Sequence, residues 1–333
     1  MNVREKKRQS KIGESLYWLR YRVGEYALRG FIAALPLIPE RWLSAFASLG
    51  ERLTFIILWK YRIRMEANLS MAMGKEFPTA AQRRALVRKA WRNFGRGFLE
   101  TSRALHLKRE KILSMVAVEG EDHLKRALAK KRGVIALSAH LGNFSMIGAR
   151  LAAAGYPFSV LVKPPRDQGF ARLMDEVRAW VGIKTISARP RKEAVRGILK
   201  ALRENGVVLL IADEFKSGEV EVNFFGQTAP APRGPAALAL RTGAAVLPMF
   251  LTRSSEDRLT IHIGPEIELL NTEGIEESVA ANTALFTGHL EAMIRRYPDQ
   301  WNWLGFRQNG QKPRSQIGLP KTAPTDQTGP VIS

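Results

Sequence analysis

Cysteine is absent from this sequence of 333 residues, and histidine is scarce, with five in the whole chain. The first absence excludes disulfide bonds, thiolate nucleophiles and cysteine metal sites. Four of the histidines lack the spacing typical of metal ligands; they are His106, His123, His262 and His289. We therefore expect neither a metal site nor a bound cofactor, so any chemistry must come from the side chains of the protein itself.

Long apolar runs are also missing. The apolar segments are Tyr26–Ile38 and Leu53–Trp59. Arg29, Pro36, Glu40 and Arg41 break the first run, and both are well short of the roughly 20 apolar residues that a spanning helix needs. No cleavable signal peptide is expected, because no short apolar core with a cleavage site follows the basic first dozen residues. Residues 14–60 are instead typical of amphipathic helices that lie on a membrane, flanked by Trp18, Trp42 and Trp59. The alternative is an ordinary helical subdomain packed on the core.

The charge is strongly unbalanced: 52 basic and 31 acidic residues give a formal net charge of +21. Such an excess favours anionic partners, namely nucleic acid, an anionic membrane surface or an acidic carrier protein. Nucleic acid is not expected, because no recognition module and no basic stripe interleaved with aromatic residues is present. With 45% hydrophobic residues, the chain suits one large folded domain with an accessory region.

The order of patterns predicts four segments. Residues 1–13 are basic and predicted to be disordered, 14–113 form a helical membrane-associating region, 114–307 an α/β domain, and 308–333 a disordered tail. In the third segment, apolar strand candidates alternate with helical stretches, which predicts an α/β fold with a mixed central sheet and helices on both faces. The expected strands are 133–137, 158–162, 207–212, 245–251 and 259–263; the expected helices are 141–153, 169–181, 192–204, 235–241 and 275–296.

One junction in this domain points to chemistry. The apolar strand 133–137 leads to His140, and a helix is expected to begin near Leu141 or Gly142. Such a junction presents an imidazole at the carboxyl edge of a sheet, where open α/β folds bind their ligands, and imidazole is well matched to taking a proton at neutral pH. Asp213 and Glu214 follow the strand 207–212 and should reach the same edge. The alternatives are a histidine that caps the helix and acids that are merely solvated.

Seven short motifs occur in a fixed order over about residues 25–307. Through them the chain resembles the lysophospholipid acyltransferase superfamily, specifically its late lipid A (lauroyl and myristoyl) acyltransferase branch. The motifs are Arg62–Leu69, Trp91–Gly95, His140–Asn143, Arg178–Gly182, Asn223–Gly226, Gly234–Gly243 and Gln300–Trp303.

The resemblance implies a glycerol-phosphate acyltransferase-like fold and a definite reaction. A fatty acyl chain would pass from acyl carrier protein or acyl-CoA to a hydroxyl of a membrane lipid, with His140 as general base. By the resemblance, the acceptor would be a lipid A precursor, a lysophospholipid or a glycolipid. The resemblance also implies a peripheral or monotopic protein on the cytoplasmic face of the bacterial inner membrane, and a basic chain suits the anionic donor and surface.

The sequence departs from that family at Ser145. In members of that family the histidine is followed five residues later by Glu or Asp, which orients the imidazole and stabilises its charged form. Here Ser145 stands at that position. Three explanations remain open. Asp213 or Glu214 replaces the missing acid; Ser145 is a nucleophile activated by His140, which the lack of a glycine-flanked elbow disfavours; or the chain is a catalytically inactive lipid-binding relative.

Further residues are candidates for substrate binding. Asn143 and Ser145 offer hydrogen-bonding groups beside His140, and for Asn143 the alternative is that its amide fixes the loop. By the resemblance, Arg178 meets a phosphate or an acidic head group, which a guanidinium matches in a bidentate fork. Lys163 and Arg166 follow the strand 158–162 and are candidates for contact with an anion. For each of these charges, a solvated surface residue is the alternative.

Arg233 and Gly234 stand at an expected helix start. Free backbone N–H groups there can hold an anion or help to neutralise an oxyanion. Near the carboxyl end, Gly305 and Phe306 occupy positions where the family usually has His-Arg, which predicts an altered acceptor or groove.

Overall fold

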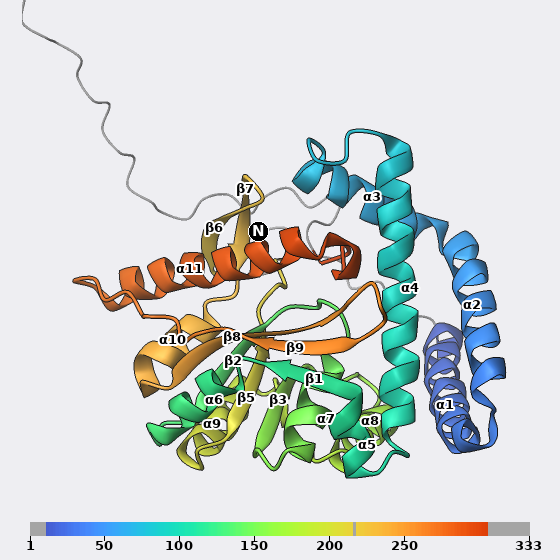
Figure 1. The fold of residues 1–333 in the computed structure, drawn as a ribbon, viewed down its shortest axis with the longest axis horizontal. Helices are drawn as coiled ribbons and strands as arrows, with labels where there is room; N and C mark the ends of the chain where they lie inside the picture. Colours follow the sequence, from blue (N-terminus) through green and yellow to red (C-terminus); the bar gives the residue numbers. More distant parts are fainter. Residues whose placement is uncertain (1–10, 216–217, 306–333) are drawn as a thin grey trace, which may run out of the picture.

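The computed structural model describes residues 11–215 and 218–305 (Figure 1). The segments expected to be disordered therefore lie largely outside it, as do Phe306 and Arg307, and helix α1 begins at Lys11. Helices occupy the first part of the described chain, up to residue 115. They are α1 (Lys11–Ala34), η1 (Leu35–Leu37), α2 (Glu40–Ile57), α3 (Trp59–Met73), α4 (Ala80–Ala104) and α5 (Arg109–Met115).

Helix α4 is the long helix beside the sheet in Figure 1, with the α1 and α2 pair on its outer side. It begins directly after Pro78 with a capping box. The Thr79 side chain accepts a hydrogen bond from the Gln82 N–H, and the Gln82 side chain accepts one from the Thr79 N–H. These bonds satisfy N–H groups that have no partner within the helix, so the sequence sets the start of α4 locally.

A seven-stranded sheet forms the centre of the second part, in the order β1-β9-β8-β2-β5-β3-β4. Strands β8, β2, β5, β3 and β4 are parallel, whereas β9 runs antiparallel to β8 and parallel to β1. The mixed α/β fold is thus confirmed, with β1 and β4 as additional strands. The strands are β1 (Val116–Glu119), β2 (Val134–Ser138), β3 (Phe158–Val162), β4 (Ile183–Ser187), β5 (Val207–Ile211), β8 (Ala245–Arg253) and β9 (Leu259–Ile263).

Helices cover both faces of this sheet, as expected. Alternate residues of β2 show the two layers: Val134 and Ala136 pack on the side of α5, α6 and α7, while Ile135 and Leu137 pack on the side of α9, α10 and α11. Every residue of β2 is buried, which explains its unbroken apolar run. The remaining helices are α6 (Glu121–Ala129), α7 (Ser145–Ala153), α8 (Gln168–Trp180), α9 (Arg191–Arg203), α10 (Gly234–Thr242), α11 (Ile275–Arg296) and η2 (Pro298–Gln300).

Two local expectations were wrong. The helix after His140 begins at Ser145, because Gly142 adopts a left-handed φ of 58° and Leu141 forms an isolated bridge with Trp301. No strand was expected between residues 212 and 235, yet residues 220–231 form a hairpin of β6 (Val220–Phe224) and β7 (Gln227–Ala231). Its two turn residues, Phe225 and Gly226, both have positive φ, the conformation that suits the twist of a two-residue hairpin.

Candidate active site

Sheet register brings His140 and Asp213 together. Ser138 at the end of β2 pairs with Ile211 at the end of the neighbouring parallel strand β5. His140 and Asp213 each lie two residues beyond these partners, so they leave the sheet side by side. The Asp213 Oδ1 lies 2.7 Å from the imidazole Nδ1, and its Oδ2 accepts a hydrogen bond of 2.8 Å from the His140 backbone N–H.

Trp301 is a third member of this group. Its indole Nε1–H donates a hydrogen bond of 2.7 Å to the Asp213 Oδ2, and its ring is fully buried. Burial alone would raise the pKa of Asp213, which is 1% exposed. The hydrogen bonds from His140 and Trp301, together with the charge of the imidazolium, outweigh that effect and hold the pKa of Asp213 below its ordinary value. Asp213 is therefore an ionised carboxylate at neutral pH.

The imidazole of His140 faces a more open environment, with 32% of its side chain exposed. Its backbone is fixed, because the carbonyl oxygen accepts a hydrogen bond of 3.0 Å from the Asn302 N–H. An ionised carboxylate only accepts hydrogen bonds, so Nδ1 must carry the proton in the neutral ring. Nε2 is then the nitrogen with the basic lone pair, and the arrangement can accept a proton there while Asp213 stabilises the resulting cation.

The other sequence candidates at this edge lie on the surface. The side chains of Glu214 and of Ser145, the first residue of α7, are exposed. Lys163 and Arg166 are exposed on the loop between β3 and α8, which starts from the same edge of the sheet. Gly234 is the exposed first residue of α10.

Arg233, beside Gly234, is engaged with acids. Its guanidinium lies 2.7 Å from the Glu276 carboxylate and 3.7 Å from that of Glu219. The hydrogen bond with Glu276 is the main cause that raises the pKa of Arg233 above its ordinary value. Much of its charge is therefore balanced within the protein.

Arg178 is not brought together with His140. It lies near the end of α8, where its guanidinium donates 2.8 Å to the Thr185 hydroxyl and 2.7 Å to the Asp175 carboxylate. Thr185 belongs to β4, the edge strand three positions across the sheet from β2, and three strand spacings amount to roughly 14 Å. These contacts join α8 to β4.

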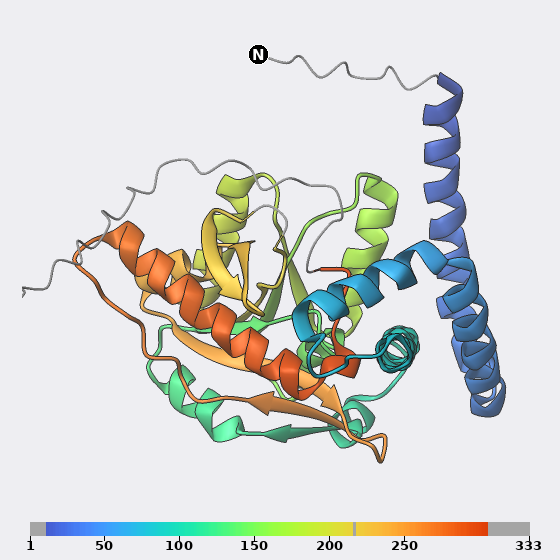
Figure 2. The ribbon, with the colours of Figure 1, turned by 90° about the horizontal axis from the view of Figure 1, so that it is seen from above.

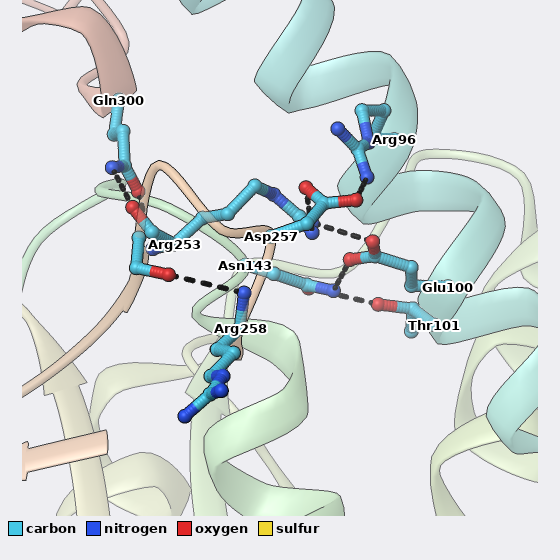
Figure 3. A network of polar contacts seen from close by, with 9 residues as sticks. Arg96, Glu100, Thr101, Asn143, Arg253, Asp257, Arg258 and Gln300 are labelled. Carbon is cyan, nitrogen blue, oxygen red and sulfur yellow. Dashed lines mark hydrogen bonds and ion pairs between the residues drawn. The ribbon is translucent and has the colours of Figure 1, made fainter. Parts of the chain in front are cut away.

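Several residues around the site were not singled out by sequence reasoning. Trp301 belongs to one of the seven motifs, but no local pattern indicates that its N–H meets an acid 88 residues away. Glu100, Arg253 and Gln300 form a polar network with Asn143 (Figure 3). Within residues 11–215 and 218–305, no group of three His, Asp or Glu side chains is placed to hold a metal ion.

A second feature of the molecule is an apolar surface on α1–α3. Along α2, Phe46, Leu49, Leu53 and Ile57 are exposed at spacings of three and four residues, which places them on one face of the helix. Figure 2 shows α1 and α2 at one side of the molecule, apart from the sheet. Among the described residues, no helix has the length and apolarity needed to cross a membrane.

A cavity of about 1260 Å³ lies between α2, α4 and the turn that joins β8 to β9. It is larger than the about 300–1,000 Å³ of typical small-ligand pockets. Its lining combines apolar side chains such as Met65, Phe94 and Leu99 with basic ones such as Arg103. Asn302, whose N–H binds the His140 carbonyl oxygen, lines it as well, so the cavity approaches the His140 loop.

The protein thus combines a mixed α/β fold with a His–Asp pair at the carboxyl edge of its sheet. The chain belongs to the bacterial lipid A biosynthesis acyltransferase family, whose model matches residues 10–308. It is thus an enzyme of the acyltransferase class, in a family that acts on lipid A or glycolipids.

Individual relatives agree with this class. The chain is 28% identical, over 72% of its length and 77% of the relative's, to a phosphatidylinositol mannoside acyltransferase of Mycolicibacterium smegmatis. It is 30% identical to the Mycobacterium tuberculosis protein of the same name, over 72% and 75% of the two chains. It is also 26% identical to the lipid A biosynthesis palmitoleoyltransferase of Escherichia coli, over 68% and 72%.

Proposed function

We propose that this enzyme moves a fatty acyl chain from an acyl thioester to a hydroxyl of a membrane glycolipid or lipid A precursor, with His140 as general base and Asp213 as its acid partner. The hydrogen bond of 2.7 Å between the buried Asp213 carboxylate and the imidazole Nδ1 carries this proposal. The names of the relatives support the acceptor class, because they refer to phosphatidylinositol mannoside and to lipid A.

The reaction follows from the pair. Nε2 of His140 takes the proton of the acceptor hydroxyl as its oxygen forms a bond to the thioester carbonyl carbon. Asp213 stabilises the imidazolium, the carbon–sulfur bond breaks, and the imidazolium returns its proton to the leaving sulfur. The products are an ester and a free thiol, and no acyl-enzyme is formed. In this proposal Asp213 takes the part of the acid absent at position 145, since Glu214 and Ser145 are exposed whereas the Asp213 carboxylate contacts the ring.

Anionic parts of the substrates would meet the basic groups at the same edge. Lys163 and Arg166 are exposed there, and they suit the phosphates of acyl-CoA or the acidic surface of acyl carrier protein. The N–H groups at Gly234 and the partly balanced charge of Arg233 are candidates to stabilise the oxyanion. Ser145, exposed on the first turn of α7, is a candidate contact for the acceptor. Arg178 stays a prediction, and its bonds to Thr185 and Asp175 favour a packing role.

The apolar face of α1–α3 supports action at a membrane surface. Exposed side chains such as Trp42, Phe46 and Leu53 would enter the boundary between head groups and acyl chains, with basic neighbours such as Arg52 near anionic lipids. We propose peripheral or monotopic attachment at the cytoplasmic face of the bacterial inner membrane, where acyl thioesters and lipid precursors meet. The cavity beside α4 has the volume and mixed lining to take part of an acyl chain.

The test is thiol release from acyl carrier protein and coenzyme A thioesters, with detergent-solubilised membrane lipids as acceptors and mass spectrometry of the products. Wild type is expected to add one acyl mass to one lipid class. We expect His140→Ala to abolish transfer and Asp213→Asn to lower kcat at least about 100-fold, because the amide does not stabilise the imidazolium. His123→Ala on α6, whose ring contacts Arg126 at the surface, is the matched control and should keep the wild-type rate.

Other outcomes would decide against the proposal in distinct ways. Loss of activity in Glu214→Gln but not in Asp213→Asn would refute the role of Asp213. An acylated protein that disappears in Ser145→Ala would indicate an acyl-enzyme. Lipid binding by wild type without thiol release from any donor would identify a catalytically inactive relative.

A further inference from the structure

Two adjacent residues of helix α4, Glu100 and Thr101, bind the side chain of Asn143 in the loop that follows His140 (Figure 3). The Glu100 Oε2 accepts a hydrogen bond of 3.1 Å from the Asn143 side-chain amide. The Thr101 hydroxyl donates 2.9 Å to the oxygen of the same amide. Two adjacent residues of α4 therefore occupy both ends of the buried Asn143 side chain, which favours a structural role for Asn143 over contact with substrate.

The second contact of Glu100 leads to the other side of the loop. Its Oε1 lies 2.5 Å from Nη2 of Arg253, the last residue of β8, and the two side chains are 20% and 10% exposed. The backbone N–H and carbonyl of Arg253 form hydrogen bonds of 2.8 and 2.7 Å with the side-chain amide of Gln300. The backbone carbonyl oxygen of Gln300 in turn accepts a hydrogen bond of 2.8 Å from the Gly142 N–H. The loop is thus held from α4 at Asn143 and from β8 at Gly142.

The space around the loop leaves little room for it to shift. A Cβ at Gly97 of α4 would lie 3.3 Å from the Asn143 Cγ, and a Cβ at Gly142 would collide with the Leu251 carbonyl oxygen. The loop is therefore packed closely between α4 and β8, and Glu100 bridges the two elements that enclose it. The charges around it are balanced, because Arg253 also pairs with Asp257, which pairs with Arg96.

We propose that Glu100 is a positioning residue of the acyl transfer, which holds the His140 loop in register with Asp213 through Asn143 and Arg253. This inference rests on the proposed function of His140. In this proposal helix α4, which belongs to the helical region, contributes to the active site through Glu100 and does not only support helices α1–α3. A displacement of about 1 Å in a reacting group can cost about 100-fold in rate, so a loop anchored in this way should matter for catalysis.

The first test is Glu100→Gln, which keeps the shape of the side chain and removes its charge. We expect kcat to fall about 10- to 100-fold, because Glu100 holds the loop that carries His140. We expect a smaller change, within about 3-fold, in KM for the thioester, because Glu100 is one of many residues that line the cavity proposed for the acyl chain. Glu266→Gln is the matched control. It breaks the surface ion pair of 2.7 Å with Lys130 and should leave kcat unchanged.

A second variant and a second readout cover the case in which Glu100→Gln fails to fold. Thr101→Val removes only the hydroxyl that donates to Asn143, and we expect kcat to fall about 3- to 10-fold. The low-field proton resonance of His140 Nδ1, which reports its hydrogen bond with Asp213, should shift or broaden in Glu100→Gln and Thr101→Val but not in Glu266→Gln.

Two results would overturn the positioning role: wild-type kcat in both Glu100→Gln and Thr101→Val, or a reduced kcat with an unchanged His140 resonance. Failure of the proposed function is a separate result. If wild type releases thiol from no donor, the acyl transfer is refuted, and the His140 resonance still decides whether Glu100 positions the loop.

Discussion

The hydrogen bond from Trp301 to Asp213 offers a sharp test, because the chain contains a matched control for it. Trp301 and Trp303 are both fully buried, and their rings lie 4.8 Å apart. The Trp301 Nε1–H donates 2.7 Å to the Asp213 carboxylate, whereas the Trp303 Nε1–H donates 2.8 Å to the Pro298 carbonyl oxygen. Replacement by Phe removes one N–H and a similar volume at each position, but only Trp301→Phe alters the environment of the carboxylate.

The expected magnitude follows from the charge of the acceptor. A hydrogen bond to a charged group contributes about 1.5–3 kcal/mol, and about 1.4 kcal/mol corresponds to a tenfold change in rate. If the whole energy of this hydrogen bond stabilises the transition state, Trp301→Phe lowers kcat by about 10- to 100-fold. The physical reason is that Asp213 loses one of the hydrogen bonds that orient its carboxylate toward the imidazole. Removal of a donor that stabilises the ionised form also raises the pKa of Asp213.

The assay is thiol release at saturating thioester and acceptor, with the unfolding free energy of each variant measured in parallel. Both variants should lose stability, since each leaves a small void and removes one hydrogen bond. Trp303→Phe should keep kcat within about 3-fold of wild type. Equal losses of kcat in the two variants would refute the reasoning, because the effect would then come from packing of the tryptophan pair. Wild-type kcat in Trp301→Phe would refute it as well.

Two further predictions concern stability and membrane binding. Because the folded pKa of Asp213 lies below its ordinary value, ionised Asp213 contributes stability that is present above about pH 4 and lost as the pH falls through the folded pKa. The unfolding free energy of Asp213→Asn should therefore vary less with pH than that of wild type between about pH 5 and 2 in urea titrations, and equal slopes would contradict this. The double variant Phe46→Glu/Leu53→Glu on α2 should bind anionic vesicles at least about 10-fold more weakly than wild type in a flotation assay, since both side chains are exposed on one face. Ile275→Glu on α11, equally exposed but far along the chain from this face, is its control, and equal weakening by the control would contradict the assignment.

Local patterns in the sequence determined much of this protein. The apolar run of β2 and its end before His140 follow from the spacing of hydrophobic residues alone, and the expected strands β3, β5, β8 and β9 lie where the pattern put them. The spacing of apolar residues along α2 likewise indicated a helix with an apolar face, and that face is exposed. Such features depend on side-chain periodicity within one element, which a sequence displays directly.

The composition of the candidate site was decided by tertiary structure. The sequence indicated that Asp213 and Glu214 reach the edge that carries His140, but not which of them turns to the imidazole. That choice depends on the order and register of strands 73 residues apart, because β5 is the neighbour of β2 and Ser138 pairs with Ile211. Trp301 follows η2, Glu100 lies on α4 and Arg253 ends β8. They reach the site through contacts that no local spacing encodes. Packing of the whole sheet sets these contacts. A buried carboxylate such as Asp213 needs hydrogen-bond donors, and those donors come from segments far away in the sequence.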